Sequence, residues 1–145
     1  MKIIQIVGYA NSGKTTLIKN LISELQKLGK VGVVKHLGDH EFNLELEKDT
    51  TEFFHAGANI SVGIDSHKTM MIIHNNSLND MLNILLKQNI NFVIIEGFKQ
   101  SSFPKIVLGD LNIKKNCVLL NPSKDQIMAS LDLFEDFYEV KKHED

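Results

Sequence analysis

Residues 8–15 read GYANSGKT and match the pattern G-x-x-x-x-G-K-[ST], which is typical of a loop that binds phosphate. Residues 2–7 (KIIQIV), just before it, form a mostly apolar, β-branched run of the kind that becomes a strand buried on both faces. After the loop, leucines recur at positions 17, 21, 25 and 28, which is the spacing of an amphipathic helix. A strand, a glycine-bounded turn and a helix in this order predict a phosphate-binding unit at the start of an α/β sheet.

The chemistry of phosphate binding explains the residue types in this loop. Gly8 and Gly13 allow backbone conformations that a Cβ atom would block. Successive backbone N–H groups then point toward an anion, and the first turn of the helix adds the positive end of its dipole. Lys14 supplies a mobile positive charge for the β- and γ-phosphates, and the Thr15 hydroxyl is a ligand for Mg²⁺. The loop therefore predicts binding of a nucleotide with Mg²⁺, the alternative being a plain glycine-rich turn with a chance Lys-Thr.

The rest of the chain alternates between apolar strand-like runs and helix-like periodicity. This alternation predicts an α/β fold of three layers, in which a mainly parallel, twisted sheet is flanked by helices. Residues 60–74 resemble a hairpin, so some antiparallel content is expected. No repeat, low-complexity stretch or Pro/Gly/Ser-rich linker occurs, and residues 1–145 are therefore expected to form one nucleotide-binding domain. Further strands are expected at 31–35, 60–64, 68–74, 91–95, 105–108 and 117–120, and further helices at 49–55 and 77–86.

A last helix is expected near the C-terminus, opening at Ser123. Gln126 stands three residues later, at the spacing of a capping box. Phe134, Phe137 and Tyr138 are expected to pack a helix onto the sheet, or alternatively to contribute to a dimer face.

An acidic residue that could complete a magnesium site is Glu96. It follows the apolar residues 92–95, where an acid is out of place unless it has a function, and a nucleotide–Mg²⁺ site needs a carboxylate at the end of a neighbouring strand. Gly97 would let the backbone approach the terminal phosphate. The alternative for Glu96 is a plain strand end at the surface, and Asp65, after the weaker run 60–64, is a competing acid.

The polar stretch after the second predicted strand holds further candidates. His36 lies at the sheet edge where such folds bind ligands. Asp49 is a candidate for binding Mg²⁺ or orienting an attacking water, and equally for a helix N-cap. His36 and His40, with Asp39 and Glu41, are a weaker candidate for a transition-metal site, and a solvated polar loop is the favoured interpretation.

Two lysines and one asparagine complete the set of candidates. Lys99 and Lys105 flank a loop that begins at Gly97, and they either contact a second anionic ligand or are ordinary surface lysines. Asn121 follows the last predicted strand, where a base-reading loop would lie. Because the chain has no N-K-x-D motif, its residues do not by themselves distinguish GTP from ATP.

The charge and cysteine content exclude several classes of function. Sixteen basic and 18 acidic residues give a net charge of −2, which offers no electrostatic reason to bind nucleic acid or a membrane surface. No stretch approaches about 18 apolar residues, so no membrane span is expected. The single cysteine, Cys117, excludes an internal disulfide and fits a reducing, cytoplasmic setting. All basic residues are lysines, so the chain has no arginine finger and slow phosphoryl transfer is expected.

Several short motifs occur in a specific order between about residues 2 and 108. The phosphate loop is common to many NTPases, whereas the other motifs are more discriminating. The motifs are GYANSGKTTL (8–17), VVKH (33–36), KDT (48–50), AGA (56–58) and EGFK (96–99), followed by PK (104–105). Together they resemble the molybdopterin-guanine dinucleotide biosynthesis protein B (MobB) family.

The resemblance implies a P-loop NTPase fold that forms a homodimer, binds GTP with Mg²⁺ and hydrolyses it slowly. Such proteins assist maturation of a molybdenum or tungsten cofactor beside the guanylyltransferase that attaches GMP to molybdopterin. That enzyme, molybdoenzymes, and molybdopterin or its guanine dinucleotide are thus the implied partners and ligands. The implied catalytic residues are Lys14 and Asp49, and the residues implied around Mg²⁺ are Thr15, Asp49 and Glu96. The implied nucleotide-site residues are Gly8, Asn11, Ser12, Gly13, Lys14, Thr15, Thr16, His36, Gly97 and Lys99.

Three other functions remain as alternatives. A metal-insertion GTPase for another metalloenzyme would use His36 and His40, and stoichiometric metal binding would distinguish it. A nucleotide-binding adaptor would hold GTP with negligible turnover. A small-molecule kinase is disfavoured, because the chain has no lid arginines and little length for a lid.

Overall fold

The computed structural model describes residues 1–45 and 48–139. Contacts within the chain divide it into two compact units, one made of Met1–Gly38 with Asn79–Asp145 and the other of Asp39–Leu78. Each unit is described below by itself. The expectation of one nucleotide-binding domain over residues 1–145 stays a prediction.

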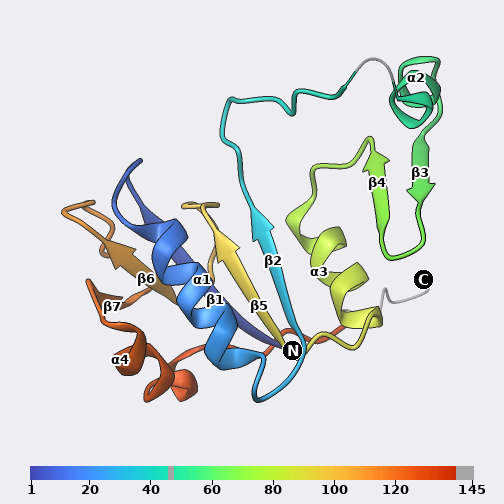
Figure 1. The fold of residues 1–145 in the computed structure, drawn as a ribbon. Helices are drawn as coiled ribbons and strands as arrows, with labels where there is room; N and C mark the ends of the chain where they lie inside the picture. The colour runs from blue at the N-terminus through green and yellow to red at the C-terminus, as the bar shows by residue number, and fades with distance from the viewer. Residues whose placement is uncertain (46–47, 140–145) are drawn as a thin grey trace, which may run out of the picture. The chain divides into compact units, whose positions relative to one another are not determined.

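The first unit is built on a five-stranded parallel sheet with the order β2-β5-β1-β6-β7 (Figure 1). The central strand β1 is buried from Ile3 to Val7, as its mostly apolar, β-branched sequence predicts for a strand with layers on both sides. The predicted mainly parallel α/β class is therefore confirmed. The strands are β1 (Lys2–Gly8), β2 (Val31–Lys35), β5 (Phe92–Glu96), β6 (Lys105–Leu108) and β7 (Cys117–Leu120).

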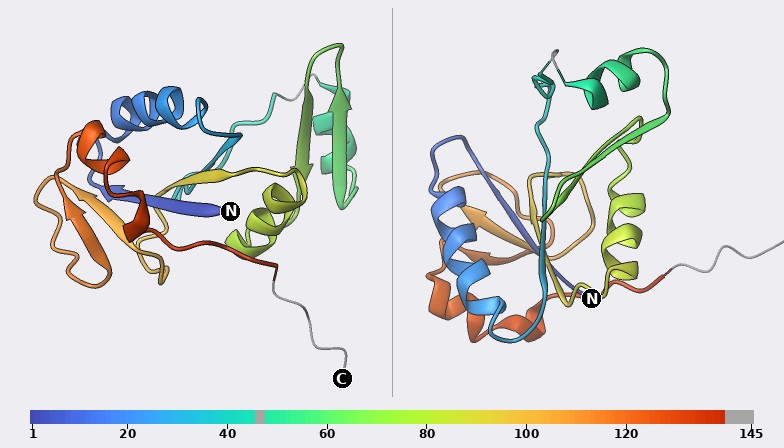
Figure 2. Two further views of the ribbon diagram at one scale, coloured as in Figure 1. Left: turned by 90° about the horizontal axis from the view of Figure 1, so that it is seen from below. Right: turned by 45° about the vertical axis from the view of Figure 1, so that its right-hand side comes forward.

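Helices cover both faces of this sheet (Figure 2). Helix α1 (Lys14–Leu25) buries Ile18, Leu21 and Leu25 against the β1 side chains of Ile4 and Ile6. Helix α3 (Leu78–Lys87) covers the opposite face, where a Cβ atom on Gly32 of β2 would lie 3.4 Å from Leu85. Among the residues that the structure describes, no helix is long and apolar enough to cross a membrane.

The connection from β5 to β6 contains no helix. Residues 97–104 instead run as an irregular loop between the two strands, each of which pairs with β1. A parallel crossover is more often made through a helix. This loop therefore needs other contacts to hold it in place, and they come from polar side chains described below.

The second unit consists of α2 (Asp49–His55) and a hairpin of β3 (Ile60–Ile64) and β4 (Thr69–Ile73). The hairpin is antiparallel, with Val62 opposite Met71, which confirms the predicted antiparallel pair. A Cβ atom on Gly63 would lie 3.0 Å from Thr50 Cγ2, so α2 packs closely on one face of the hairpin.

The C-terminal part of the first unit agrees with prediction at its start and differs from it at its end. Helix α4 (Lys124–Met128) has the predicted capping box, with Ser123 and Gln126 bonding reciprocally. A short 3₁₀ turn, η1 (Leu131–Leu133), follows. The expectation of a helix that carries Phe134, Phe137 and Tyr138 is wrong: the segment beyond η1 contains no helix up to residue 139.

The reason for this difference is a long-range pairing with the start of β1. Phe137 N donates to Met1 O at 2.7 Å, and Ile3 N donates to Glu135 O at 3.0 Å. Phe134 and Phe137 are buried, whereas Tyr138 is exposed. An extended segment that pairs with β1 therefore overrides the helical spacing of the aromatic residues.

Candidate phosphate-binding site

The turn between β1 and α1 leaves the N-terminus of the helix available to an anion. Gly13 is the N-cap, with a left-handed φ of 86°, and no side chain caps the helix. The first turn of α1 contains no acidic residue. The free N–H groups and the positive end of the dipole of this 12-residue helix therefore face no negative charge from its own first turn.

Gly8 lets this loop close against β6. A Cβ atom on Gly8 would lie 2.6 Å from Ser12 Oγ and 2.9 Å from the carbonyl oxygen of Leu108. The Ser12 hydroxyl is itself buried and has no hydrogen-bond partner within the described part of the chain. A buried hydroxyl without a partner is costly, and a phosphate oxygen would satisfy it.

Lys14 reaches back over the same turn. Its Nζ donates to Gly8 O at 3.2 Å and to Tyr9 O at 2.5 Å, which places the ammonium group on the loop itself. Thr15 and Thr16 are exposed at the start of α1, so their hydroxyl groups are accessible to a ligand. The cap, the buried hydroxyl and the ammonium group all fit the phosphate tail of a nucleotide.

Glu96 is the last residue of β5 and stands opposite Ile6 of β1 in the sheet register. Its side chain is 13% exposed, and Lys35 Nζ lies 3.6 Å from its Oε2. Lys35 is also opposite Glu96 in the pairing of β2 with β5. The carboxylate therefore lies on the strand next to the one that carries the loop, with a lysine as its ion-pair partner.

His36 and Gly97 form the part of the site that follows β2 and β5. His36 N donates to Glu96 O at 2.9 Å, and its ring stacks on Phe98 with 4.4 Å between centroids. Gly97 has a φ of 91°, and a Cβ atom there would lie 3.0 Å from His36 Cβ. The missing Cβ atom of Gly97 allows this close approach of His36. Its N–H group donates to Ile6 O at 3.0 Å and so belongs to the hydrogen bonds of the sheet.

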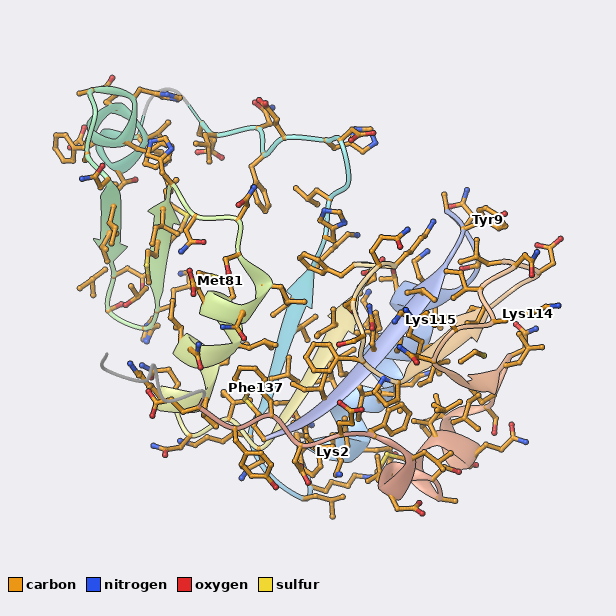
Figure 3. All side chains as sticks on the ribbon, turned by 180° about the vertical axis from the view of Figure 1, so that it is seen from behind. Lys2, Tyr9, Met81, Lys114, Lys115 and Phe137 are labelled. Carbon is orange, nitrogen blue, oxygen red and sulfur yellow. The ribbon has the colours of Figure 1, made fainter. Side chains whose placement is uncertain are left out.

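Lys99 lies over the ring of Tyr9, with 5.7 Å between Nζ and the ring centroid. Tyr9 is an exposed residue of the phosphate loop and follows the C-terminal end of β1, whereas Lys2 begins the strand at its other end (Figure 3). The contact is a cation–π pair that joins residues 97–104 to the phosphate loop. Lys99 is thus brought next to the predicted site, and its ammonium group is exposed.

Lys105 is neither a surface lysine nor free to bind a second anion, so both interpretations of it are wrong. It is 1% exposed, and its Nζ donates to Ser101 O and, at 3.0 Å, to Phe103 O. Burial, and secondarily the positive charge of Lys115, lowers the pKa of Lys105 below its ordinary value.

This lowered pKa predicts a stability that rises at alkaline pH. The unfolded chain holds the Lys105 proton up to about pH 10.4, whereas the folded chain releases it earlier, so unfolding takes up a proton between the two pKa values. The free energy of unfolding should rise across that window by about 1.4 kcal/mol per unit of pKa difference. Urea unfolding of the wild type and Lys105→Met between pH 7 and 10 measures it, and parallel pH profiles would contradict it.

Asp49 belongs to the other unit, so its place beside Lys14, Thr15 and Glu96 stays a prediction. The helix at 49–55 is confirmed, but its N-cap is Lys48 and Asp49 is the first helical residue. An acid in the first turn is still favoured by the dipole. The expectation that Asp49 itself is the cap is therefore wrong by one position.

The competing metal sites receive no support. Asp65 accepts hydrogen bonds from the backbone of His67 and Lys68 in the hairpin turn, and the Lys68 ammonium group lowers the pKa of its carboxyl group. Within residues 1–45 and 48–139, no group of three or more His, Cys, Asp and Glu side chains is placed to hold a metal ion. His36 belongs to the first unit and His40 to the second, so a cluster of the two stays a prediction.

Two polar side chains have roles in the structure that the sequence does not show. The side chain of Asn121 is already bonded to Gly109, accepting from its N–H at 2.6 Å and donating to its carbonyl at 3.1 Å, so it anchors a turn. Gln5 belongs to none of the motifs and is not predicted from the sequence as a residue that contributes to the site. The available signal was a polar side chain in the middle of the buried run KIIQIV.

Comparisons with known proteins identify the family of this chain. Residues 3–132 match the family model MobB, described as molybdopterin guanine dinucleotide synthesis protein B. A Methanocaldococcus jannaschii protein described as a molybdopterin-guanine dinucleotide biosynthesis adapter protein is 38% identical over 115 residues, which cover 74% of this chain and 47% of that protein. The adapter protein of Haemophilus influenzae is 32% identical over 111 residues, which cover 73% and 62%.

The fold has close counterparts among solved structures. The crystal structure of Bacillus subtilis MobB matches with a TM-score of 0.68 and 24% identity, over 83% of this chain and 77% of that chain. A MobB homolog from Bacillus stearothermophilus matches with a TM-score of 0.62 and 22% identity, over 90% and 92%. These matches show that the chain shares the fold of those proteins. The chain spans between about half and two thirds of the length of the curated relatives it matches.

Proposed function

The chain belongs to the MobB family, and on that premise we propose that it is a GTP-binding adapter of molybdopterin-guanine dinucleotide biosynthesis with slow, Mg²⁺-dependent GTP hydrolysis. The observation that carries the proposal is the uncapped start of α1, where Gly13 opens the helix beside the partnerless Ser12 hydroxyl and the Lys14 ammonium group. The names of its relatives supply the pathway.

The residues divide into groups by the part of the ligand they would contact. The loop residues Gly8, Asn11, Ser12, Gly13, Lys14, Thr15 and Thr16 bind the phosphates, and His36, Gly97 and Lys99 lie beside them. Thr15, Asp49 and Glu96 hold the metal ion. Mg²⁺, when bound, neutralises charge on the β- and γ-phosphates. Lys14 stabilises the charge of the transferring phosphoryl group, and Asp49 orients the attacking water.

Slow hydrolysis follows from the residues that the chain lacks. It contains no arginine, so neither this chain nor a second copy supplies a guanidinium group to the γ-phosphate. Such a group is worth about 10³–10⁵ in rate. We place the protein as a cytoplasmic homodimer that acts with the guanylyltransferase and with molybdoenzymes, and that binds molybdopterin or its guanine dinucleotide.

Isothermal titration with GTP and with ATP, each with Mg²⁺, tests the proposal. We expect GTP to bind at least tenfold more tightly than ATP, with one site per chain. Failure of the intact protein to bind either nucleotide would refute a nucleotide-binding function. Preference for ATP would refute the guanine assignment alone.

The arginine-free sequence also favours a second candidate, an adapter that holds GTP without turnover. Phosphate release by the wild type, compared with Lys14→Ala at saturating GTP, separates the two. Release above that of the variant supports the slow GTPase, and equal rates support the adapter without turnover.

The ion pair between Lys35 and Glu96 predicts competition with the metal ion. If Glu96 binds Mg²⁺, the ammonium group at 3.6 Å must give way, and Lys35→Met removes the competitor. Since an ion pair whose lysine is exposed is worth about 1 kcal/mol or less, we expect the Mg²⁺ concentration for half-maximal GTP binding to fall about two- to fivefold. A fluorescent GTP analogue titrated with Mg²⁺ measures this. Lys27→Met, which loses the ion pair with Glu24 just beyond the end of α1, is the control. An unchanged or higher requirement would contradict the assignment of Glu96.

A further inference from the structure

Two polar side chains are fully buried side by side in the sheet of the first unit. Gln5 is 0% exposed and Lys105 is 1% exposed, and they stand opposite each other in the pairing of β1 with β6. Side chains alternate between the faces of a strand, and the neighbours Ile4 and Ile106 belong to the core under α1. Gln5 and Lys105 therefore lie on the other face.

Gln5 bonds to the loop that connects β5 with β6. Its Nε2 donates to Gly97 O at 2.7 Å and to Phe98 O at 2.8 Å. Its Oε1 accepts from Ser101 Oγ at 2.7 Å. One buried amide group thus uses both of its ends to hold residues 97–104.

Lys105 holds the same loop from the next strand. Its Nζ donates to the carbonyl oxygens of Ser101 and Phe103. Among the described residues, no carboxylate lies within ion-pair distance of this ammonium group. Burying a charge against carbonyl groups alone is unfavourable, and an apolar side chain would pack here at lower cost. The contribution of Lys105 is that its hydrogen bonds fix the position of residues 97–104.

The loop held in this way carries groups of the phosphate site. Phe98 has a left-handed φ of 51°, which is unfavourable for a residue with a Cβ atom and persists only when the surroundings impose it. Its ring stacks on His36, and Lys99 next to it lies over Tyr9 of the phosphate loop. The buried amide and ammonium groups therefore set where these contacts form.

We propose that Gln5 and Lys105 are positioning residues for nucleotide binding: they clamp residues 97–104 onto the sheet, so that Phe98 and Lys99 are held against His36 and Tyr9 beside the phosphate loop. The inference rests on the proposed function, because the positioned groups serve a bound nucleotide. Neither Gln5 nor Lys105 touches the ligand, since both are buried beneath the loop.

Three variants and one control test the clamp. Gln5→Met keeps the length of the side chain and Lys105→Met shortens it by one atom, and both remove its hydrogen bonds. Ser101→Ala removes only the link to Gln5. Ile106→Val is the matched control: it shortens a buried β6 side chain that faces the α1 core. Circular dichroism and thermal melting establish that each variant is folded. Ser101→Ala leaves both buried side chains in place and keeps the test informative if a buried substitution prevents folding.

The first readout is independent of any ligand. Trypsin cuts the exposed Lys99–Gln100 bond only as fast as the loop opens, so the rate of that first cut, identified by mass spectrometry, reports on the clamp. We expect Gln5→Met and Lys105→Met to raise this rate at least tenfold and Ser101→Ala about threefold. The cleavage rate of Ile106→Val should stay within twofold of the wild-type rate, even if its melting temperature falls as much as that of Gln5→Met or Lys105→Met.

The second readout is the affinity for a fluorescent GTP analogue with Mg²⁺. We expect Gln5→Met and Lys105→Met to weaken it at least fivefold and Ile106→Val to leave it within twofold. Unchanged cleavage in all three loop variants would overturn the clamp. Faster cleavage with wild-type affinity would overturn the positioning role alone. Wild-type protein that binds no nucleotide would overturn the proposed function and the positioning role together, and the cleavage rates would still decide whether the clamp exists.

Discussion

We expect Lys14→Ala to lower the affinity for Mg²⁺–GTP at least 100-fold and to reduce GTP hydrolysis to background. Lys14 Nζ lies on the phosphate loop, bonded to the carbonyl oxygens of Gly8 and Tyr9. The substitution removes a positive charge where a triphosphate would bring several negative ones. A charged hydrogen bond is worth about 1.5–3 kcal/mol, and about 2.7 kcal/mol corresponds to the 100-fold loss. Titration calorimetry measures the affinity, and phosphate release measures the turnover.

Lys19→Ala is the matched control for this substitution. Lys19 is exposed on the same helix, five positions further along, and it removes an equal charge without touching the loop. It should bind GTP within twofold of the wild type, and both variants should melt within a few degrees of it. Wild-type affinity in Lys14→Ala would contradict the assignment of the phosphate site to this loop.

Gly8→Ala should weaken GTP binding at least tenfold and lower the free energy of unfolding by about 1–3 kcal/mol. The added Cβ atom would meet Ser12 Oγ at 2.6 Å and the carbonyl oxygen of Leu108 at 2.9 Å. The hydroxyl group can rotate away, but the carbonyl oxygen belongs to the backbone of β6. The loop must therefore move off that strand, and this displaces the N–H groups that would face the phosphates. Urea unfolding and titration with a fluorescent GTP analogue measure the two effects.

Gly32→Ala provides the comparison. A Cβ atom on Gly32 would lie 3.4 Å from side-chain atoms of Leu85 and Ile90, an ordinary contact distance, and far smaller effects on stability and affinity are expected. The role given to Gly8 would be wrong if Gly8→Ala bound GTP as tightly as the wild type or if Gly32→Ala were equally impaired.

Elements whose signal lies in neighbouring residues were predictable from the sequence. The strand at 31–35 and the helix at 49–55 agree with prediction at both ends, and β1 extends by one residue to Gly8. Their apolar runs and periodicity are local properties, and burial in the sheet follows them. The phosphate loop was predictable for the same reason, because the strand, the glycines and the helix are consecutive in the chain.

Features that depend on distant partners were not predictable in this way. The aromatic residues Phe134 and Phe137 have helical spacing, but pairing with the start of β1 decides their conformation. Lysine is usually a surface residue, and Lys105 is buried only because residues 97–104 run over it. The Lys35–Glu96 pair required the β2–β5 register. Asp49 stays a prediction as a metal ligand, because it belongs to the other compact unit.

The strand order has a consequence for synthesis on the ribosome. The two neighbours of β1 are β5 and β6. Lys2 therefore cannot pair until Phe92 has been synthesised, and Gln5 cannot pair until Lys105 has been synthesised. Until then the nascent chain exposes an unpaired, strongly apolar strand, and only α1 is available to shield one side of it. Contacts so far apart in the chain slow folding and favour aggregation. The emerging chain should therefore be most prone to aggregation before residues 92–108 have been synthesised.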